Sequence, residues 1–198
     1  MMTSRTSRGF APAFAFTVAC LLAALPRAQA QEPDAGARAQ ARELRARGVA
    51  EHREGAYEKA VETFTRAIEL DPRDALGFFD RATSRAEIPD LDAALADFDE
   101  ALKLDPALAD AYVGRGRVLA AKGEVAKAIA DYSRAVDSNP DAPLAYFARG
   151  QAEASLGQYD KALDDYDEAV GLAPSNALFH LSRGDVHRAK GGHKRAVE

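Results

Sequence analysis

The chain has 198 residues with a formal net charge of −5 at pH 7, and 29% of its residues are charged. This acidic balance argues against nucleic acid as a partner, because phosphate-binding surfaces need clustered lysine and arginine. The single cysteine excludes an internal disulfide, so the chain must be stabilised by packing.

The first thirty residues have the composition of a secretory signal peptide. They contain three arginines and no acidic residue, and a mainly apolar run extends over residues 10–25. The sequence AQA at residues 28–30 offers the small-x-small pattern that a signal peptidase cleaves. We therefore expect a signal peptide over residues 1–30, cleavage after Ala30, and a periplasmic or secreted mature chain. Loss of the three arginines would change the net charge from −5 to −8.

Two alternatives to cleavage stay open. The apolar run could be a retained membrane anchor, although it is short for a span of about 20 residues and ends at Pro26. Cys20 could carry a lipid, because Val18-Ala19-Cys20 loosely resembles a lipoprotein signal, although the apolar run continues to Leu25. In both cases the protein would stay attached to a membrane through this segment.

Prolines divide the rest of the chain at a fixed interval. Pro72, Pro106, Pro140 and Pro174 follow one another at a spacing of 34 residues. A period of this length is the signature of a helical repeat protein. We assign residues 31–40 to a linker and residues 41–198 to a repeat domain. Its units are residues 41–74, 75–108, 109–142 and 143–176, followed by a partial unit over residues 177–198.

Each unit contains two apolar-periodic stretches joined by a short turn. In the fourth unit, helical spacing relates Tyr146 to Glu153 and, after the turn, Tyr159 to Tyr166. The turns contain Gly55, Gly123 and Gly157 in three of the units. Glycine can adopt the left-handed conformation that ends a first helix, and the terminal proline cannot continue the second. Each unit is therefore predicted to be a helical hairpin, and the turn with Pro89 in place of glycine should differ from the others.

Small residues recur where the two helices of a hairpin must cross, which lets their backbones come close. They are Gly48, Ala82, Gly116, Gly150 and Gly184 on first helices and Ala60, Ala94, Ala128 and Ala162 on second helices. Large residues lie beside them: Leu44, Phe78, Tyr112 and Tyr146 on first helices and Phe64, Phe98, Tyr132 and Tyr166 on second helices. We interpret these large side chains as core residues rather than as a cofactor site.

This pattern resembles the tetratricopeptide repeat family over residues 41–198. The resemblance implies an all-α fold, a right-handed superhelical solenoid of antiparallel helix hairpins with a 34-residue period. It implies that the first helices line a concave groove. It also implies that the protein holds other proteins or peptides, since few members of the family have chemistry of their own.

The resemblance places groove residues at the second, fifth, ninth and twelfth positions of each unit. The candidate partner-binding residues are Arg45, Leu76, Phe79, Val113, Arg117, Leu144, Phe147, Gln151, Leu178 and Leu181. The apolar members have no evident reason to be large within their own repeat, and an exposed apolar stripe marks an interaction site. We expect this groove to accept a peptide or helix. The alternative is that some of these residues cover neighbouring first helices.

Some members of the family grip a C-terminal carboxylate with lysine, asparagine and arginine side chains on three successive first helices. The corresponding residues here are Arg45, Val49, Asp80, Asp110 and Gly114. Because this set of side chains differs from that pattern, we do not expect a receptor for a chaperone tail.

The chain departs from the family pattern at a slot that usually holds leucine. Arginine occupies this slot in every unit: Arg47, Arg81, Arg115, Arg149 and Arg183. Three units also carry aspartate directly before the aromatic residue of the second helix: Asp97, Asp131 and Asp165. We hypothesise that Arg81, Arg115 and Arg149 pair with these carboxylates, because a guanidinium in a partly buried interface needs a partner. The alternative is an arginine whose stem packs while its head reaches water.

No group of residues predicts catalysis. His180 and His187 are seven residues apart, about 10 Å along a helix, which is too far for one metal ion without further ligands. His180 falls at the slot of the large first-helix side chains, where we expect a packed imidazole. Asp164 and Asp165 lie on a predicted second helix with no cleft that would raise a pKa. We therefore expect no metal site, no cofactor and no enzymatic activity.

The leading hypothesis is a protein–protein interaction scaffold of the bacterial cell envelope. Its partners would be proteins or peptides, with membrane contact only through the signal segment before cleavage. One alternative is a binding module of a longer enzyme or secretion component, since Glu198 falls inside the expected second helix of the fifth unit. Another is a subunit that self-associates through the uncapped C-terminal end, because repeat stacks normally end in a polar cap.

Overall fold

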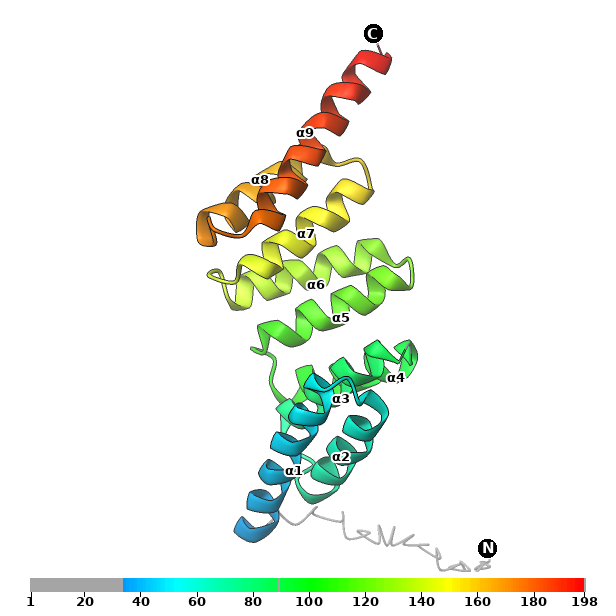
Figure 1. The fold of residues 1–198 in the computed structure, drawn as a ribbon, viewed down its shortest axis with the longest axis vertical. Helices are drawn as coiled ribbons and strands as arrows, with labels where there is room; N and C mark the ends of the chain where they lie inside the picture. The colour runs from blue at the N-terminus through cyan, green and yellow to red at the C-terminus, as the bar shows by residue number, and fades with distance from the viewer. Residues whose placement is uncertain (1–33, 89, 198) are drawn as a thin grey trace, which may run out of the picture. The chain divides into compact units, whose positions relative to one another are not determined.

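The computed structural model describes residues 34–88 and 90–197, with side chains as far as Gly191. The expected signal peptide and its cleavage site lie outside the described residues, as do Pro89 and Glu198. The described part of the chain contains nine α-helices and no strand, which confirms the all-α class (Figure 1). In chain order the helices are α1 (Ala35–Arg53), α2 (Tyr57–Leu70), α3 (Ala75–Glu87), α4 (Leu91–Leu104), α5 (Ala109–Ala121), α6 (Val125–Ser138), α7 (Pro143–Ser155), α8 (Tyr159–Leu172) and α9 (Ala177–Val197).

The helices form consecutive hairpins that stack on one another, with odd-numbered helices as first helices and even-numbered helices as second helices. Each helix packs against the next one in the chain, and each first helix also touches the first helix of the following unit. Within the described residues no helix contacts one that is further away in the chain, which is the contact pattern of a repeat protein. Helices α3, α5, α7 and α9 begin at the first residues of the predicted units, which confirms the 34-residue period.

Helix α1 begins earlier than expected. It starts at Ala35, so residues 35–40, which the sequence pattern assigned to a linker, are helical. Asp34 caps this end, because its Oδ1 accepts a hydrogen bond of 2.7 Å from the Ala37 amide. Residues 37–42 are all alanine, arginine or glutamine, which favour the helix, so no residue interrupts it before the first unit.

Helix α9 continues past the position where the fifth unit was expected to turn. In other units the turn glycines have a positive φ, of 77° at Gly55, 81° at Gly123 and 73° at Gly157. The corresponding Gly191 lies inside α9, so the expected second helix of a fifth unit is not formed in the described residues.

Each of the four hairpin turns contains an equivalent backbone hydrogen bond. The amide of the residue before each second helix donates to the carbonyl five residues earlier, at 2.9–3.0 Å. The pairs are Ala56 to Glu51, Asp90 to Arg85, Glu124 to Leu119 and Gln158 to Glu153. The turn of the second unit therefore keeps the bond of its counterparts, although Pro89 itself lies outside the described residues.

The two helices of a hairpin cross closely because glycine or alanine lies at the crossing. A Cβ atom added to Gly116 on α5 would lie 2.5 Å from the ring of Tyr132 on α6, too close for a stable contact. The same arrangement recurs with Gly48 against Phe64 and Gly150 against Tyr166. The four second-helix aromatics predicted for the core, Phe64, Phe98, Tyr132 and Tyr166, are 1–3% exposed, which confirms that they form the core.

The large side chains of the first helices pack against the core as predicted, but they lie at its edge and are not fully buried. Phe78, Tyr112 and Tyr146 are only half-buried, and the arginine three residues later lies 5.6–5.7 Å from the centre of each ring. His180 has the same position in the last unit and is exposed, with its Nε2 2.8 Å from the Pro174 carbonyl. No second helix covers His180 among the described residues, so its imidazole is not packed.

The predicted arginine–aspartate pairs are present in three units. They are Arg81 with Asp97, Arg115 with Asp131 and Arg149 with Asp165. In each pair, Nε and Nη2 of the arginine donate two hydrogen bonds of 2.7–2.8 Å to the two carboxylate oxygens. The Nη1 atoms donate at 2.6–3.2 Å to the second helix of the preceding unit, at Thr65, Asp99 and Ser133. We call this series of contacts the arginine ladder.

The arginine ladder changes in the first and last units. In the first unit Thr63 stands in place of the aspartate, and Glu51 supplies the carboxylate. Glu51 accepts hydrogen bonds from Arg47 at 2.9 Å and from Thr63 at 2.6 Å. In the last unit Arg183 donates to Asp167 of the preceding unit at 2.6 Å. The contact between neighbouring units is therefore kept as far as α9.

Asp131→Ala should lower the free energy of unfolding by about 2–3 kcal/mol, because it leaves a partly buried guanidinium without its bidentate partner. Asp137→Ala removes an exposed carboxylate from the same helix and should change the free energy by less than about 0.5 kcal/mol. Denaturant unfolding followed by circular dichroism measures both variants. Equal effects of the two substitutions would show that the arginine ladder does not stabilise the stack.

Candidate functional site

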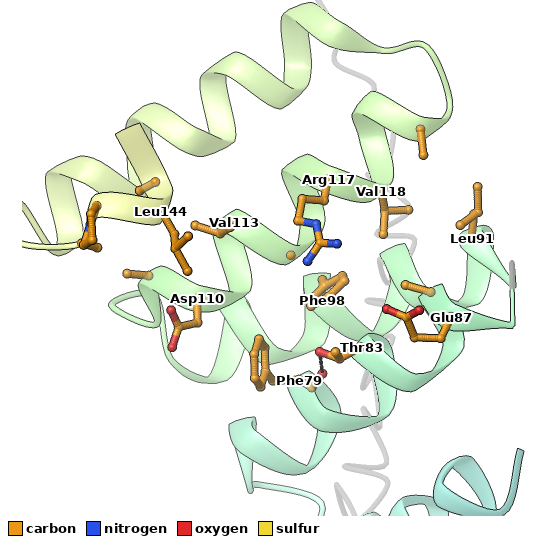
Figure 2. Close-up of a pocket in the computed structure, with 17 residues that line it drawn as sticks. Phe79, Thr83, Glu87, Leu91, Phe98, Asp110, Val113, Arg117, Val118 and Leu144 are labelled. Atoms are coloured by element: carbon orange, nitrogen blue, oxygen red, sulfur yellow. Dashed lines mark hydrogen bonds between the residues drawn. The ribbon is translucent and has the colours of Figure 1, made fainter. Parts of the chain in front are cut away.

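A cavity of about 510 Å³ opens between successive first helices. Its walls come from α3, α5 and the start of α7, and α4 contributes to its base (Figure 2). Residues at the wall include Phe79 and Thr83 on α3, Leu91 and Phe98 on α4, Val113, Arg117 and Val118 on α5, and Leu144 on α7. We call this space the groove cavity.

The base of the groove cavity is apolar. Phe98 is 1% exposed and Val118 is 3% exposed, and the Phe79 ring lies 6.1 Å from the Phe98 ring, centre to centre. Gly114 also lines the cavity, and a Cβ atom added there would lie 2.5 Å from the Phe98 ring. Because Gly114 has no side chain, Phe98 of α4 can lie against α5 and form part of the cavity wall.

Three charged residues that line the cavity have no ion-pair partner in the part of the chain that the structure describes. Glu87, Asp110 and Arg117 are all exposed. Within the described residues no salt bridge involves any of them, whereas the arginines of the arginine ladder are each held by a carboxylate. The groove cavity therefore combines an apolar base with one cation and two anions that are available to a ligand.

The structure brings four of the predicted groove residues together. Phe79, Val113, Arg117 and Leu144 all line the groove cavity. Outside the cavity, the exposed members of the predicted set are Leu76, Gln151, Leu178 and Leu181. Leu178 and Leu181 are 51% and 60% exposed on α9. Four of the predicted groove residues therefore line the cavity, and four others are exposed outside it.

Phe147 is buried, so it is not the exposed groove residue that the sequence pattern indicated. It is 7% exposed, and its ring centre lies 5.6 Å from that of Tyr166 and 4.7 Å from that of Phe179. Phe179 on α9 occupies a position where the two preceding units have Ala111 and Ala145. Because this larger side chain covers Phe147, the alternative of packing against a neighbouring first helix applies here.

The sequence pattern did not select Leu91 and Phe98 as groove residues. Both belong to α4, a second helix, and the groove was expected to consist of first helices. One signal was Gly114, because the corresponding residues of the neighbouring units are Asp80 and Ala148. A glycine inside a helix that also has a tight crossing glycine two residues later indicates that a second large side chain approaches the same helix.

Arg45, the remaining predicted groove residue, is held between two aspartates. Its Nε lies 3.7 Å from Oδ2 of Asp74 and 4.0 Å from Oδ2 of Asp80. The Asp80 side chain is only 20% exposed. Burial raises the pKa of Asp80 to about 6, against the effect of Arg45, which lowers it. Arg45 is therefore already engaged in the folded chain.

Asp80→Asn should stabilise the protein at about pH 7.5 but not at about pH 4. Because the pKa of Asp80 is about 6 in the folded protein and lower in the unfolded chain, the folded state binds the proton more tightly. This contribution to stability is present below the unfolded pKa and is lost as the pH rises through the folded pKa. Thermal unfolding at both pH values tests the prediction, with Asp110→Asn as the exposed control. A Tm difference that does not change with pH would contradict it.

Metal binding and membrane insertion have no candidate site in the described part of the chain. Among residues 34–88 and 90–197, no group of three or more histidine, cysteine, aspartate or glutamate residues is placed to hold a metal ion. In the same part of the chain, no helix combines the length and the apolar character that crossing a membrane requires. The groove cavity is therefore the site that we consider for function.

Solved structures share this arrangement of hairpins. MamA from Desulfovibrio magneticus RS-1 is 25% identical, with a TM-score of 0.68 over 80% of this chain and 89% of that chain. The first TPR domain of Spaghetti (RPAP3), solved bound to the HSP90 peptide SRMEEVD, is 22% identical, with a TM-score of 0.60 over 64% of this chain and 98% of that chain. The TPR domain of Arabidopsis OM64 is 24% identical, with a TM-score of 0.59 over 61% of this chain and 99% of that chain.

Sequence comparison agrees with the fold. One tetratricopeptide repeat model matches at residues 79–143, 128–177 and 147–198, and a second tetratricopeptide repeat model matches at residues 41–74. No curated protein sequence matches the chain significantly. The matched segments are the same hairpins that build the stack and the groove cavity. The chain therefore belongs to the tetratricopeptide repeat family.

Proposed function

We propose that the protein is an interaction scaffold that binds a peptide or helix of another protein in the groove cavity. The observation that carries this proposal is the cavity of about 510 Å³, which apolar side chains from three successive first helices surround. An apolar centre with a polar rim is the usual composition of a protein-binding site. Membership of the tetratricopeptide repeat family supports the same function, as does the peptide bound to Spaghetti.

The residues of the groove cavity favour apolar anchors over recognition of a terminal carboxylate. Arg117 is the one cation among the cavity residues, and it shares the cavity with the carboxylates of Glu87 and Asp110. Arg45, further toward the N-terminus, lies beside Asp74 and Asp80 instead of facing a ligand alone. A peptide carboxylate would meet no concentrated positive charge here, so affinity would come from buried aliphatic or aromatic side chains.

We further propose that this scaffold acts in the bacterial cell envelope by binding and not by catalysis. The support for export lies in residues 1–30, with their arginines, apolar run and AQA triplet. N-terminal sequencing of the protein from a periplasmic or secreted fraction should find Gln31 as the first residue. A chain that keeps residues 1–30 would contradict cleavage and would favour the membrane-anchored alternative.

Leu144→Asp should weaken partner binding by about tenfold or more, because it places a carboxylate in the apolar wall of the groove cavity. Leu144 is 61% exposed, so the substitution should leave the helices intact. Leu156→Asp, at the residue that directly follows α7 and lies outside the cavity, is the matched control at 48% exposure. Affinity capture from envelope extract, quantified by mass spectrometry, compares the variants after circular dichroism has verified their helix content. Equal capture by both variants would refute the proposed site.

A further inference from the structure

One face of α5 carries an apolar residue between two opposite charges. Asp110, Val113 and Arg117 are spaced by three and four residues, so they share one side of the helix, and all three line the groove cavity. Seven residues separate the two charges, about 10.5 Å along the helix axis. This separation is close to the diameter of an α-helix with its side chains, roughly 10–12 Å. The space between the two charges therefore has the width of one helix.

An apolar path crosses α5 between these charges. It leads from Phe79 on α3 over Val113 to Leu144 on α7 (Figure 2). Helix α5 contacts both α3 and α7, and packed helices lie about 8–10 Å apart. Residues i, i+4 and i+7 of an α-helix lie on one face, about 6 and 10.5 Å apart along its axis. A helix that lies across α5 can therefore contact all three apolar residues with one apolar stripe.

The charges beside this path are free to meet those of a ligand. Asp110 and Arg117 are exposed, and neither has an ion-pair partner in the part of the chain that the structure describes. Glu87 on α3 is unpaired in the same way, and Figure 2 places it on the Arg117 side of Val113. Within the arginine ladder, by contrast, the two charges of each pair bind each other. A ligand would therefore break no internal ion pair when it binds these residues.

We infer that the occupant of the groove cavity is an amphipathic helix whose apolar stripe has a basic edge facing Asp110 and an acidic edge facing Arg117. This inference rests on the proposed function, because it specifies the chemistry of the partner at the same site. The apolar stripe would cover Phe79, Val113 and Leu144. The two charged edges would also set the direction of the bound helix, because a reversed helix would bring like charges together.

Three synthetic helical peptides with the same apolar stripe test this chemistry. One has a lysine edge and a glutamate edge, the second has two glutamate edges, and the third has two lysine edges. Their affinities are measured by fluorescence anisotropy for the wild-type protein, Asp110→Arg and Arg117→Glu. Asp137→Arg and Arg134→Glu on α6 are the matched controls, because they change the net charge equally at exposed positions outside the cavity.

The wild-type protein should bind the peptide with mixed edges most tightly. Relative to its control, Asp110→Arg should shift the preference about fivefold toward the glutamate-edged peptide. Arg117→Glu should shift it by a similar factor toward the lysine-edged peptide. Added salt should reduce both shifts, because exposed charges are screened.

Two results would overturn the inference. In the first, the peptide preference of the cavity variants changes no more than that of their controls; in the second, the wild-type protein binds none of the peptides.

The capture experiment tests the proposed function independently of these peptides. If Leu144→Asp abolishes partner capture but the charge substitutions in the cavity do not change the preference among the peptides, the proposed function stands and the amphipathic-helix inference fails. If Leu144→Asp captures partners as well as its control does, both fail.

Discussion

The arginine ladder is the interaction on which the rest of the stack depends. In three units one guanidinium binds the carboxylate on its own second helix and also a side chain on the preceding second helix. A planar group with five donors can serve two helices at once, which leucine at the same slot cannot do. The ladder joins neighbouring hairpins by directional contacts, and the crossing glycines and alanines set how closely each hairpin closes.

These contacts all lie on the side of each first helix that faces the second helices, which leaves the opposite side free for function. Whether a side chain on that opposite side is exposed or buried then depends on the residue of the next unit that faces it. Phe79 and Phe147 hold the same repeat position, but only Phe147 is covered, because Phe179 stands in the next unit where Phe79 has Ala111. One large side chain on α9 therefore buries Phe147, whereas the small side chain of Ala111 leaves Phe79 at the wall of a cavity.

The distribution of paired and unpaired charges separates stabilising groups from those available for binding. Charges in the ladder are partly buried and matched in geometry, so they contribute to stability. Glu87, Asp110 and Arg117 are exposed at the groove cavity and contribute no ion pair to the described fold. Asp80 lies between these two classes, because it is largely buried and lies near Arg45, yet burial raises its pKa to about 6. An exposed charge beside an apolar wall acts mainly on the choice and direction of a partner.

The sequence by itself determined the 34-residue period, the hairpins, the buried second-helix aromatics and the arginine–aspartate pairs. Each of these depends on residues at constant spacing within one unit, so it can be read from the pattern of a single repeat. Only the tertiary structure decided where the groove is open, that Leu91 and Phe98 belong to it, and that Phe147 does not. It also decided that α9 continues through Gly191. These features depend on which side chain or helix of the neighbouring unit lies opposite, and repeat spacing does not specify that contact.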